Sequence, residues 1–418
     1  MKERWIGKQQ EKRWDDYPSF LFNFREFVVV LEIGVRSIES RGIKMSKGRL
    51  FYTIITLGPL GAVVLYPVIA VYTVYSLIKD GSGWLRERMR GDRPLTFFYA
   101  CVMLSTVFSQ DILISLLAFS IFTIQVFAYV IAGKLAGKFQ DRLLNDVLLV
   151  GSVVSLIGII QYLFIDFTIP QRWLDRTLYN PEHYKRVFST FFNPNVLAGY
   201  LILIISLSLS SLNRKEAIKT IGLVLALLCL FFTFSRGGWI GAMAAVLTTV
   251  VLKRDRKSLA VFVLCMAAIT AVFWADIAGR ANGALNDSTF GYRVEIWRTA
   301  LEVFGWYPLF GCGFGTSWKI IPTISPEIDA LVGHAHNLYL NFAMETGVVG
   351  LSAFVVFIAS RIARGYHRLR TPEGSGCDMT AGIVGGVAGM LVHGFVDAVP
   401  IAPQLGIVIW LLLGAAGI

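Results

Sequence analysis

The sequence predicts an all-α, polytopic membrane protein, and three observations support this fold class. Apolar residues make up 55% of the 418-residue chain and charged residues only 16%, and the mean hydropathy of +0.61 lies outside the usual range of soluble domains. Apolar runs of roughly 17 to 25 residues recur along the chain, which is the length that a helix needs to cross a bilayer. Helices are predicted because an isolated strand in lipid would leave its backbone groups without partners.

The first fifty residues differ in composition from the rest of the chain. Residues 1–50 carry eleven Lys and Arg residues, and we expect this segment to lie in the cytoplasm or along the membrane surface. It is too long and too charged for a cleavable signal peptide. Residues 51–418 are predicted to form the transmembrane helical domain. The net charge of +11 is concentrated between the apolar runs, where it sets orientation, so nucleic-acid binding is not expected.

The hydropathy pattern predicts about twelve transmembrane helices. Residues 51–78 are long for one span and contain Gly58-Pro59-Leu60-Gly61, so we interpret them as a hairpin of two spans. The other spans are predicted at residues 94–108, 111–133, 143–166, 192–211, 217–234, 239–252, 258–276, 337–360, 379–397 and 400–417.

Loop charge predicts the orientation of these helices. Every second connection should be rich in Lys and Arg and should face the cytoplasm. The connections that meet this rule are 134–142, 214–215, 253–257 and 361–370. Both termini are then cytoplasmic, and one large extracytoplasmic loop of about sixty residues, 277–336, is expected to contain short helices. Arg236, Arg293, His334 and His336 all fall on the outer side.

The sequence His334-Ala335-His336-Asn337 precedes an apolar helix and contains two of only five histidines. An imidazole can take a proton near neutral pH, so this position suits a general base. Alternatively, either ring caps the helix or binds a backbone carbonyl. Metal binding is not predicted, because two histidines one residue apart, without a carboxylate at ligand spacing, do not supply a convincing coordination set.

Two isolated arginines are candidates for binding an anionic substrate. Arg236 lies in the turn Phe234-Ser235-Arg236-Gly237-Gly238-Trp239, whose glycines allow close approach of a ligand. Arg293 lies with Trp297 on one face of a predicted amphipathic helix over residues 291–300. A guanidinium group suits a diphosphate because it donates two parallel hydrogen bonds. The alternative is an interfacial arginine that reaches toward lipid headgroups.

Other polar positions have more than one interpretation. In Asn193-Pro194-Asn195 we expect Asn195 to cap the next helix, with its amide dipoles directed outward toward anions. Gly313 and Gly315 belong to a run of alternating glycines that forms either a phosphate-binding loop or a tight connection.

Glu345, His393 and Asp397 are ionisable residues within predicted spans that carry part of the argument. Glu345 follows His336 by nine residues, and His393 precedes Asp397 by one turn. Buried ionisable groups imply polar partners. We interpret His393 and Asp397 as a structural hydrogen-bonded pair.

Taken together, these motifs resemble those of the O-antigen ligase and polymerase superfamily over about residues 190–350. The resemblance rests on Asn193-Pro194-Asn195, Ser235 to Gly238, Arg293 with Trp297, Pro308 to Gly315, and His334 to Gly347. It implies a GT-C-type glycosyltransferase architecture, independence from metal ions and cofactors, and an undecaprenyl-diphosphate-linked oligosaccharide donor. It also implies catalytic roles for His336, Arg236 and Arg293. The substrate-binding residues expected from it are His334, Asn337, Asn193, Asn195, Trp297, Arg298, Gly313 and Gly315.

The predicted function is therefore a membrane glycosyltransferase of the polysaccharide polymerase or O-antigen ligase type. It would act at the outer face of a bacterial cytoplasmic membrane in cell envelope biogenesis, as in lipopolysaccharide assembly, and transfer glycan to the hydroxyl of a glycan or glycolipid acceptor. The residues do not decide between ligase and polymerase. A transporter or flippase of an anionic lipid-linked glycan is the main alternative. Against it, there is no clear internal repeat, and the motif residues lie at one membrane face rather than at the midplane.

Overall fold

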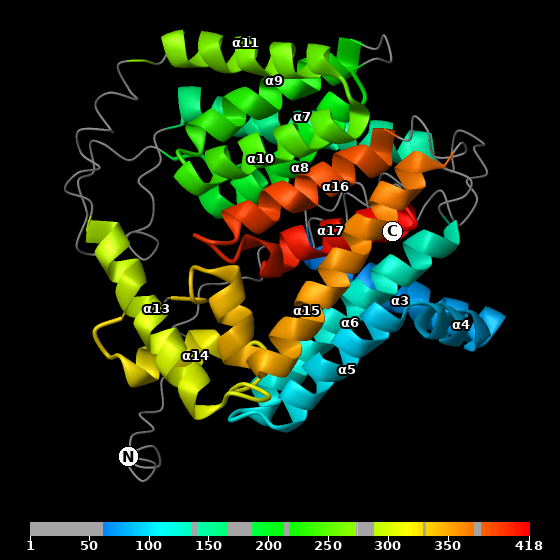
Figure 1. The fold of residues 1–418 in the computed structure, drawn as a ribbon, viewed down its shortest axis with the longest axis vertical. Coiled ribbons are helices and arrows are strands. Elements are labelled where there is room, and N and C mark those ends of the chain that lie inside the picture. Colours follow the sequence, from blue (N-terminus) through cyan, green and yellow to red (C-terminus); the bar gives the residue numbers. More distant parts are fainter. Residues whose placement is uncertain are drawn as a thin grey trace. The chain divides into compact units, whose positions relative to one another are not determined.

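The computed structural model describes residues 62–135, 140–165, 186–212, 217–272, 274, 288–328, 332–371 and 378–418. Every regular element in these residues is a helix, which confirms the predicted all-helical chain (Figure 1). The described helices belong to one unit, residues 51–418, and this unit is described by itself.

Three described helices are long and apolar enough to cross a membrane: α6 (Ile112–Leu135), α7 (Gln140–Phe164) and α15 (Leu338–Arg370). Shorter apolar helices are α5 (Arg93–Val107), α8 (Pro194–Ser210), α9 (Ala217–Phe232), α10 (Arg236–Lys253), α11 (Arg256–Val272), α16 (Asp378–His393) and α17 (Pro403–Ala415). The remaining α-helices are α3 (Ala62–Asp80), α4 (Gly83–Gly91), α13 (Ser288–Trp306) and α14 (Ser317–Ile324), with short 3-10 turns at Ser189–Phe191 and Val399–Ile401.

These helices support a membrane protein, and each span predicted from residue 94 onward overlaps one of them. The total of twelve spans and the GT-C-type architecture stay predictions. The first part of the predicted hairpin and the segment 1–50 lie outside the described residues, and the structure describes one helix, α3, in the rest of that hairpin. The predicted amphipathic helix of the large loop lies within α13.

Contacts between residues at their ends join helices α8, α10, α15 and α16. Asn195, at the start of α8, donates a hydrogen bond to Asp397, which follows the end of α16, and Asn337, which caps the start of α15, donates to the carbonyl of Phe395. At the other end of the same helices, Lys253 at the end of α10 pairs with Asp378 at the start of α16. We call the first of these ends the histidine end, because His334 and His336 lie there.

Helix α15 is broken at Gly347, whose φ of 67° and ψ of −172° are not helical. The loop from Pro308 to Gly315 fills this break. The amide of Val348 donates to the carbonyl of Pro308 at 2.8 Å, and the amide of Cys312 donates to the carbonyl of Met344 at 2.9 Å. A loop that replaces lost helical hydrogen bonds satisfies backbone groups that would otherwise be buried without partners. The break therefore anchors the polar segment to the helical bundle.

A small second core lies around this anchor. Ile296, Ala300 and Val303 of α13 are buried together with Ile320 and Ile321 of α14 and with Met344 of α15. In Figure 1, α13 and α14 lie together beside the first part of α15. Because these α13 residues are buried, the core fixes the orientation of α13 and so the position of Arg293.

We predict that Gly347→Ala destabilises the protein by about 2 kcal/mol or more, since the left-handed backbone alone costs a residue with a side chain about 1–3 kcal/mol. A Cβ at this position would also lie 2.2 Å from the carbonyl oxygen of Leu309. The measurement is the thermal midpoint of the detergent-solubilised protein.

Gly305→Ala is the matched control, because Gly305 lies in α13 with nothing within 4 Å of an added Cβ, and the change should leave stability equal or slightly higher. Equal midpoints for Gly347→Ala and the unchanged protein would contradict the proposed role of the break.

Candidate functional site

The centre of the histidine end is the carboxylate of Asp397, which is 2% exposed. His334 Nε2 lies 3.2 Å from Asp397 Oδ1 and His336 Nδ1 lies 3.4 Å from the same oxygen. Asn195 donates to Oδ2 at 2.6 Å, and the amide of Ala398 donates to Oδ1 at 2.8 Å. A buried carboxylate needs such partners to offset the loss of hydration. Asp397 therefore holds the two histidines together, and it corrects the expectation that its side chain pairs with His393.

The pKa values of the two rings shift in opposite directions, although Asp397 favours the charged form of both. Burial opposes protonation of His334, but the hydrogen bond and negative charge of Asp397 prevail and raise the pKa of His334. Burial, the adjacent His334 and the charge of Arg293 together lower the pKa of His336. The pKa of Asp397 is lowered by both histidines despite its burial. Near neutral pH, His336 is the ring favoured to stay uncharged and able to accept a proton.

His336 Nδ1 is buried and makes no hydrogen bond within the described structure, although it lies near the carboxylate of Asp397. His336 also has a left-handed backbone, with φ of 46°, which is uncommon for a residue with a side chain. The flanking chain fixes this conformation: the amide of Ala335 donates to Asn341, and the amide of Leu338 donates to the carbonyl of Gly394 at 2.7 Å. Backbone strain held in place by neighbours is common at functional sites.

The sequence predicted that Asn195 caps helix α8, and this prediction was wrong. Asn193 is the cap, since its side chain accepts from the amides of Asn195 and Val196. The side chain of Asn195 is thereby available for Asp397. Its oxygen accepts a hydrogen bond at 2.8 Å from Arg186.

Arg186 is a residue that the sequence reasoning missed. Its guanidinium group joins Asn195 to the carbonyl of Thr233, at 2.8 Å each, and its charge acts on His393. It thus connects the start of α8 with the turn before α10. The only signal in the sequence was its position seven residues before Asn193 in a predicted outer segment.

Arg236 begins α10 directly after the cap Ser235, which accepts from the amide of Gly238. The next residue, Gly237, packs against the end of α16: a Cβ there would lie 2.8 Å from Cδ2 of His393 and 2.4 Å from Val396. The glycine is required for this close packing. The exposed Arg236 is therefore held beside the turn that carries Asp397.

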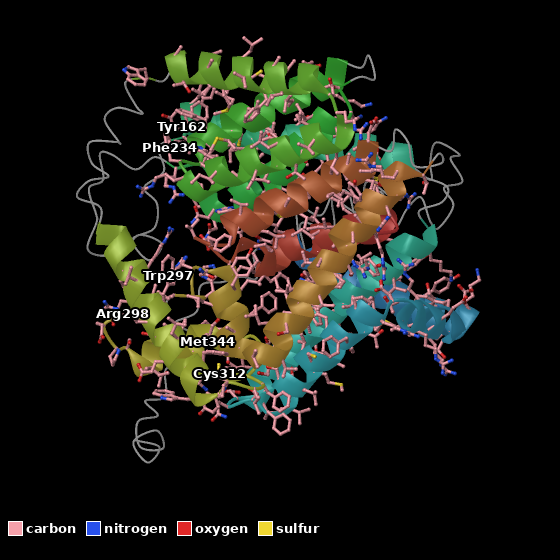
Figure 2. All side chains as sticks on the ribbon, viewed as in Figure 1. Tyr162, Phe234, Trp297, Arg298, Cys312 and Met344 are labelled. Atoms are coloured by element: carbon pink, nitrogen blue, oxygen red, sulfur yellow. The ribbon has the colours of Figure 1, made fainter. Side chains whose placement is uncertain are left out.

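Helix α13 contributes Arg293, whose charge acts on both His336 and His393. Trp297, one turn later, is partly buried, whereas Arg298 is exposed and pairs with Glu295 at 3.4 Å. Figure 2 shows Trp297 and Arg298 on different sides of α13. The structure thus brings Arg293 to the histidines and directs Arg298 elsewhere.

The glycines of the predicted phosphate loop have packing neighbours. Gly313 and Gly315 both have positive φ, and a Cβ would lie 2.0 Å from Ser109 in the first case and 2.3 Å from Ala118 in the second. These contacts favour the tight-connection interpretation of the motif. Below the loop, the amide of Ser317 donates to the buried carboxylate of Glu345, which ties α14 to α15.

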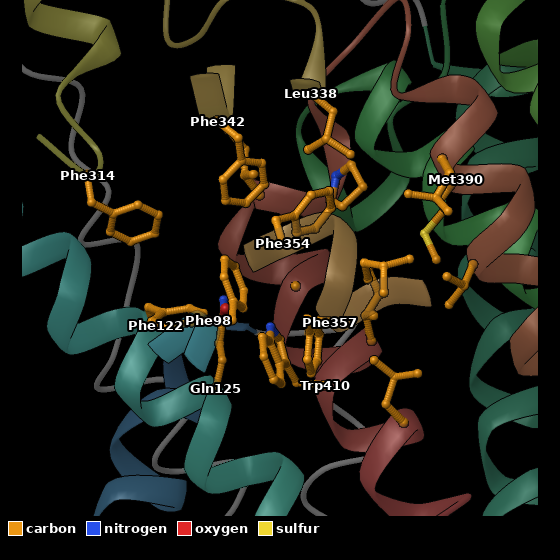
Figure 3. A pocket seen from close by; sticks show the side chains of 18 residues that line it. Phe98, Phe122, Gln125, Phe314, Leu338, Phe342, Phe354, Phe357, Met390 and Trp410 are labelled. Carbon is orange, nitrogen blue, oxygen red and sulfur yellow. The ribbon is translucent and has the colours of Figure 1, made fainter. Parts of the chain in front are cut away.

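An apolar cavity of about 100 Å³ lies beneath the histidine segment, with Leu338 among its lining residues. Aromatic rings from α5, α6, α15 and α17 surround it (Figure 3). The amide of Gln125 in its wall donates to Tyr66 at 2.7 Å. An apolar space of this kind has no group to move a proton, so we place the chemistry at the histidines and not in this cavity.

His334, His336 and Asp397 are also the groups best placed to hold a metal ion, since their ligand atoms lie within 4.8 Å of one another. Two features of the site disfavour an ion. The carboxylate already accepts hydrogen bonds from Asn195 and Ala398, and the charge of Arg293 acts on His336. A further cation would be repelled by the arginine.

Comparison with known proteins identifies one part of the chain. The family model described as O-antigen ligase matches residues 221–355, a stretch that contains Arg236, Arg293, His334 and His336. No curated protein matches the sequence. Arg186, Asn195 and Asp397 lie outside the matched residues.

Proposed function

We propose that the chain is an inverting, metal-independent glycosyltransferase of the O-antigen ligase and polymerase type, a proposal that the match of residues 221–355 to the O-antigen ligase family supports. It transfers a glycan from undecaprenyl diphosphate to a sugar hydroxyl at the outer face of a bacterial cytoplasmic membrane. The observation that carries the proposal is the convergence of two imidazoles on one buried carboxylate beside an arginine.

His336 is the proposed general base. Asp397 lies on the Nδ1 side of its ring, so Nε2 is the nitrogen that accepts the proton of the acceptor hydroxyl. The acceptor oxygen forms a bond to the anomeric carbon as the bond from that carbon to the diphosphate oxygen breaks. The proton moves to His336, and the electron pair leaves with the lipid diphosphate. Attack opposite to the leaving group inverts the anomeric configuration.

Arg236 and Arg293 are proposed to bind the diphosphate. Negative charge grows on the departing phosphate in the transition state, and fixed guanidinium groups stabilise that charge without a metal ion. Burial and the adjacent His334 lower the pKa of His336, and the positive charge of Arg293 adds to this lowering. Arg293 would thus act on both the diphosphate of the donor and the catalytic base.

Asp397 and Asn195 are proposed as positioning residues. The carboxylate orients both imidazoles, and Asn195 in turn fixes the carboxylate with a 2.6 Å hydrogen bond. His334, which the carboxylate favours in its charged form, is suited to binding an anionic or hydroxyl group of the substrate rather than to accepting a proton.

We predict that His336→Ala lowers the rate of glycan transfer by roughly 10²–10⁴-fold, because general base catalysis contributes about that much. Arg236→Ala and Arg293→Ala should each lower it by roughly 10²–10³-fold. The measurement is release of undecaprenyl diphosphate and formation of an inverted glycosidic bond by the purified protein in proteoliposomes.

Lys319→Ala is the control for loss of a cation from the polar loop, since Lys319 pairs with Asp111 at 2.5 Å and its charge is not among those that act on the histidines. It should retain the normal rate. Lipid that crosses the bilayer without a new glycosidic bond would instead identify a flippase, and retention of configuration would exclude the proposed attack.

We also predict that the transfer rate is unchanged after treatment with a chelator and dialysis, because arginine rather than a metal ion neutralises the diphosphate. The test compares initial rates before and after EDTA, with zinc and magnesium added back separately. Loss of activity that one of these ions restores would assign His334, His336 and Asp397 to a metal site and refute the metal-independent mechanism.

A further inference from the structure

A second charged cluster lies at the end of the bundle opposite to the histidines. Asp92, which caps α5, is 1% exposed and accepts two hydrogen bonds from Arg361, at 2.6 Å each, and two from Arg364, at 2.9 Å each. Arg361 follows Asn337 by 24 residues of α15, which corresponds to roughly 36 Å of helix. The proposed glycan transfer does not use this cluster.

Two further arginines join it. Tyr129, whose hydroxyl donates to Asp92 at 2.8 Å, accepts a hydrogen bond from Arg88 at 2.9 Å, and the guanidinium of Arg88 lies 5.1 Å from the centre of the Tyr129 ring. Arg368 donates to the carbonyl of Ala416 at the end of α17. Among the described residues, these four guanidinium groups therefore lie around one side-chain carboxylate, that of Asp92, and the main-chain oxygen of Ile418, which accepts hydrogen bonds from Arg361 and Tyr129.

The positive charge of this cluster is not balanced among the described residues. Asp92 is the one carboxylate that forms ion pairs with these arginines in the described parts of the chain. The carbonyls at the C-terminal end of α17 supply only about half an elementary negative charge. Nε of Arg88 is buried and makes no hydrogen bond within the described structure. Like charges this close, in a partly buried place, require a counter-anion.

The amphipathic character of helix α4 indicates that the anion is a lipid headgroup. Its residues Trp84, Leu85 and Met89 pack against the apolar core, while Arg86 and Arg90 are exposed. A short helix with an apolar face, a tryptophan and a basic face lies in the interface between lipid and water. At that depth the abundant anions are phospholipid headgroups, and basic pockets between helices bind them.

We propose that Arg88, Arg364 and Arg368, with α4, bind the phosphate of an anionic phospholipid at the membrane face opposite to the histidines. Arg361 is occupied by Asp92, Tyr129, Ser360 and the main-chain oxygen of Ile418, and it keeps the cluster assembled. Arg364 is 35% exposed, so its outer edge can face the headgroup, and Arg88 holds a free donor at Nε.

The test is native mass spectrometry of the full-length protein in detergent. Phosphatidylglycerol or phosphatidylcholine with the same acyl chains is added, and a third arm receives orthophosphate. We expect phosphatidylglycerol to be retained at least about tenfold more tightly than phosphatidylcholine, the ratio that one charge-assisted hydrogen bond can supply. Orthophosphate should not displace it.

Two variants locate the site. Arg88→Gln leaves both arginine contacts to Asp92 intact and should weaken retention of phosphatidylglycerol by about tenfold. Arg370→Gln removes a charge from the same end of α15, where Arg370 lies over Tyr366, and should leave retention unchanged.

Equal retention of the two lipids, unchanged retention in Arg88→Gln, or equal losses in Arg88→Gln and Arg370→Gln would overturn the proposal. Displacement of the lipid by orthophosphate would also overturn it, because the cluster would then be a site for free phosphate. The thermal midpoint of each variant checks that the comparison is made between folded proteins.

Discussion

The histidine end depends on one buried carboxylate. Asp397 lies in the turn after α16, yet its two oxygens collect groups from the start of α8, from the segment before α15 and from its own turn. A carboxylate without these partners would be costly to bury, and each partner without the carboxylate would lose its orientation. The positions of Asn195, His334 and His336 therefore depend on a single carboxylate, while burial and the adjacent His334 set the pKa of His336 apart from that of His334.

A second constraint fixes the outer polar segment to the bundle. The break of α15 at Gly347 exposes backbone groups that the Pro308 to Gly315 loop satisfies. The loop continues into α14, which shares a small core with α13. Arg293 on α13 is thereby held in a fixed position relative to the histidines. The alternating glycines serve this connection, because their contacts leave no room for side chains.

Much of the architecture could be predicted from sequence because the bilayer imposes a simple rule on helix length and loop charge. The positions of α5 to α11 and α15 to α17 follow from apolar runs alone, and the grouping of Arg293 with the histidines follows from topology. Side-chain pairing was less predictable. His393 and Asp397 are one helical turn apart and suggested a pair, but α16 ends at His393, so the carboxylate turns toward α8 and α15 instead.

Arg186 was missed for a related reason, because its contacts with Asn195 and Thr233 span 9 and 47 residues and no local pattern encodes them. The cap at Asn193 was missed for a different reason, since its contacts are local. In Asn193-Pro194-Asn195 both asparagines are equally good caps by residue type, and only the proline at the first helical position assigns the cap to Asn193. The arginine cluster around Asp92 was equally unpredictable from sequence, because Arg361 and Arg364 lie 269 and 272 residues away from Asp92.

The central claim is that Asp397 holds His334 in its charged form and leaves His336 neutral. Titration of ring-labelled histidines by NMR tests it directly. The account predicts that the pKa of His334 lies above and that of His336 below the ordinary imidazole value of about 6.5, and that Asp397→Asn lowers the pKa of His334. Two rings that titrate together near the ordinary value, or a His334 pKa that is insensitive to Asp397→Asn, would contradict it.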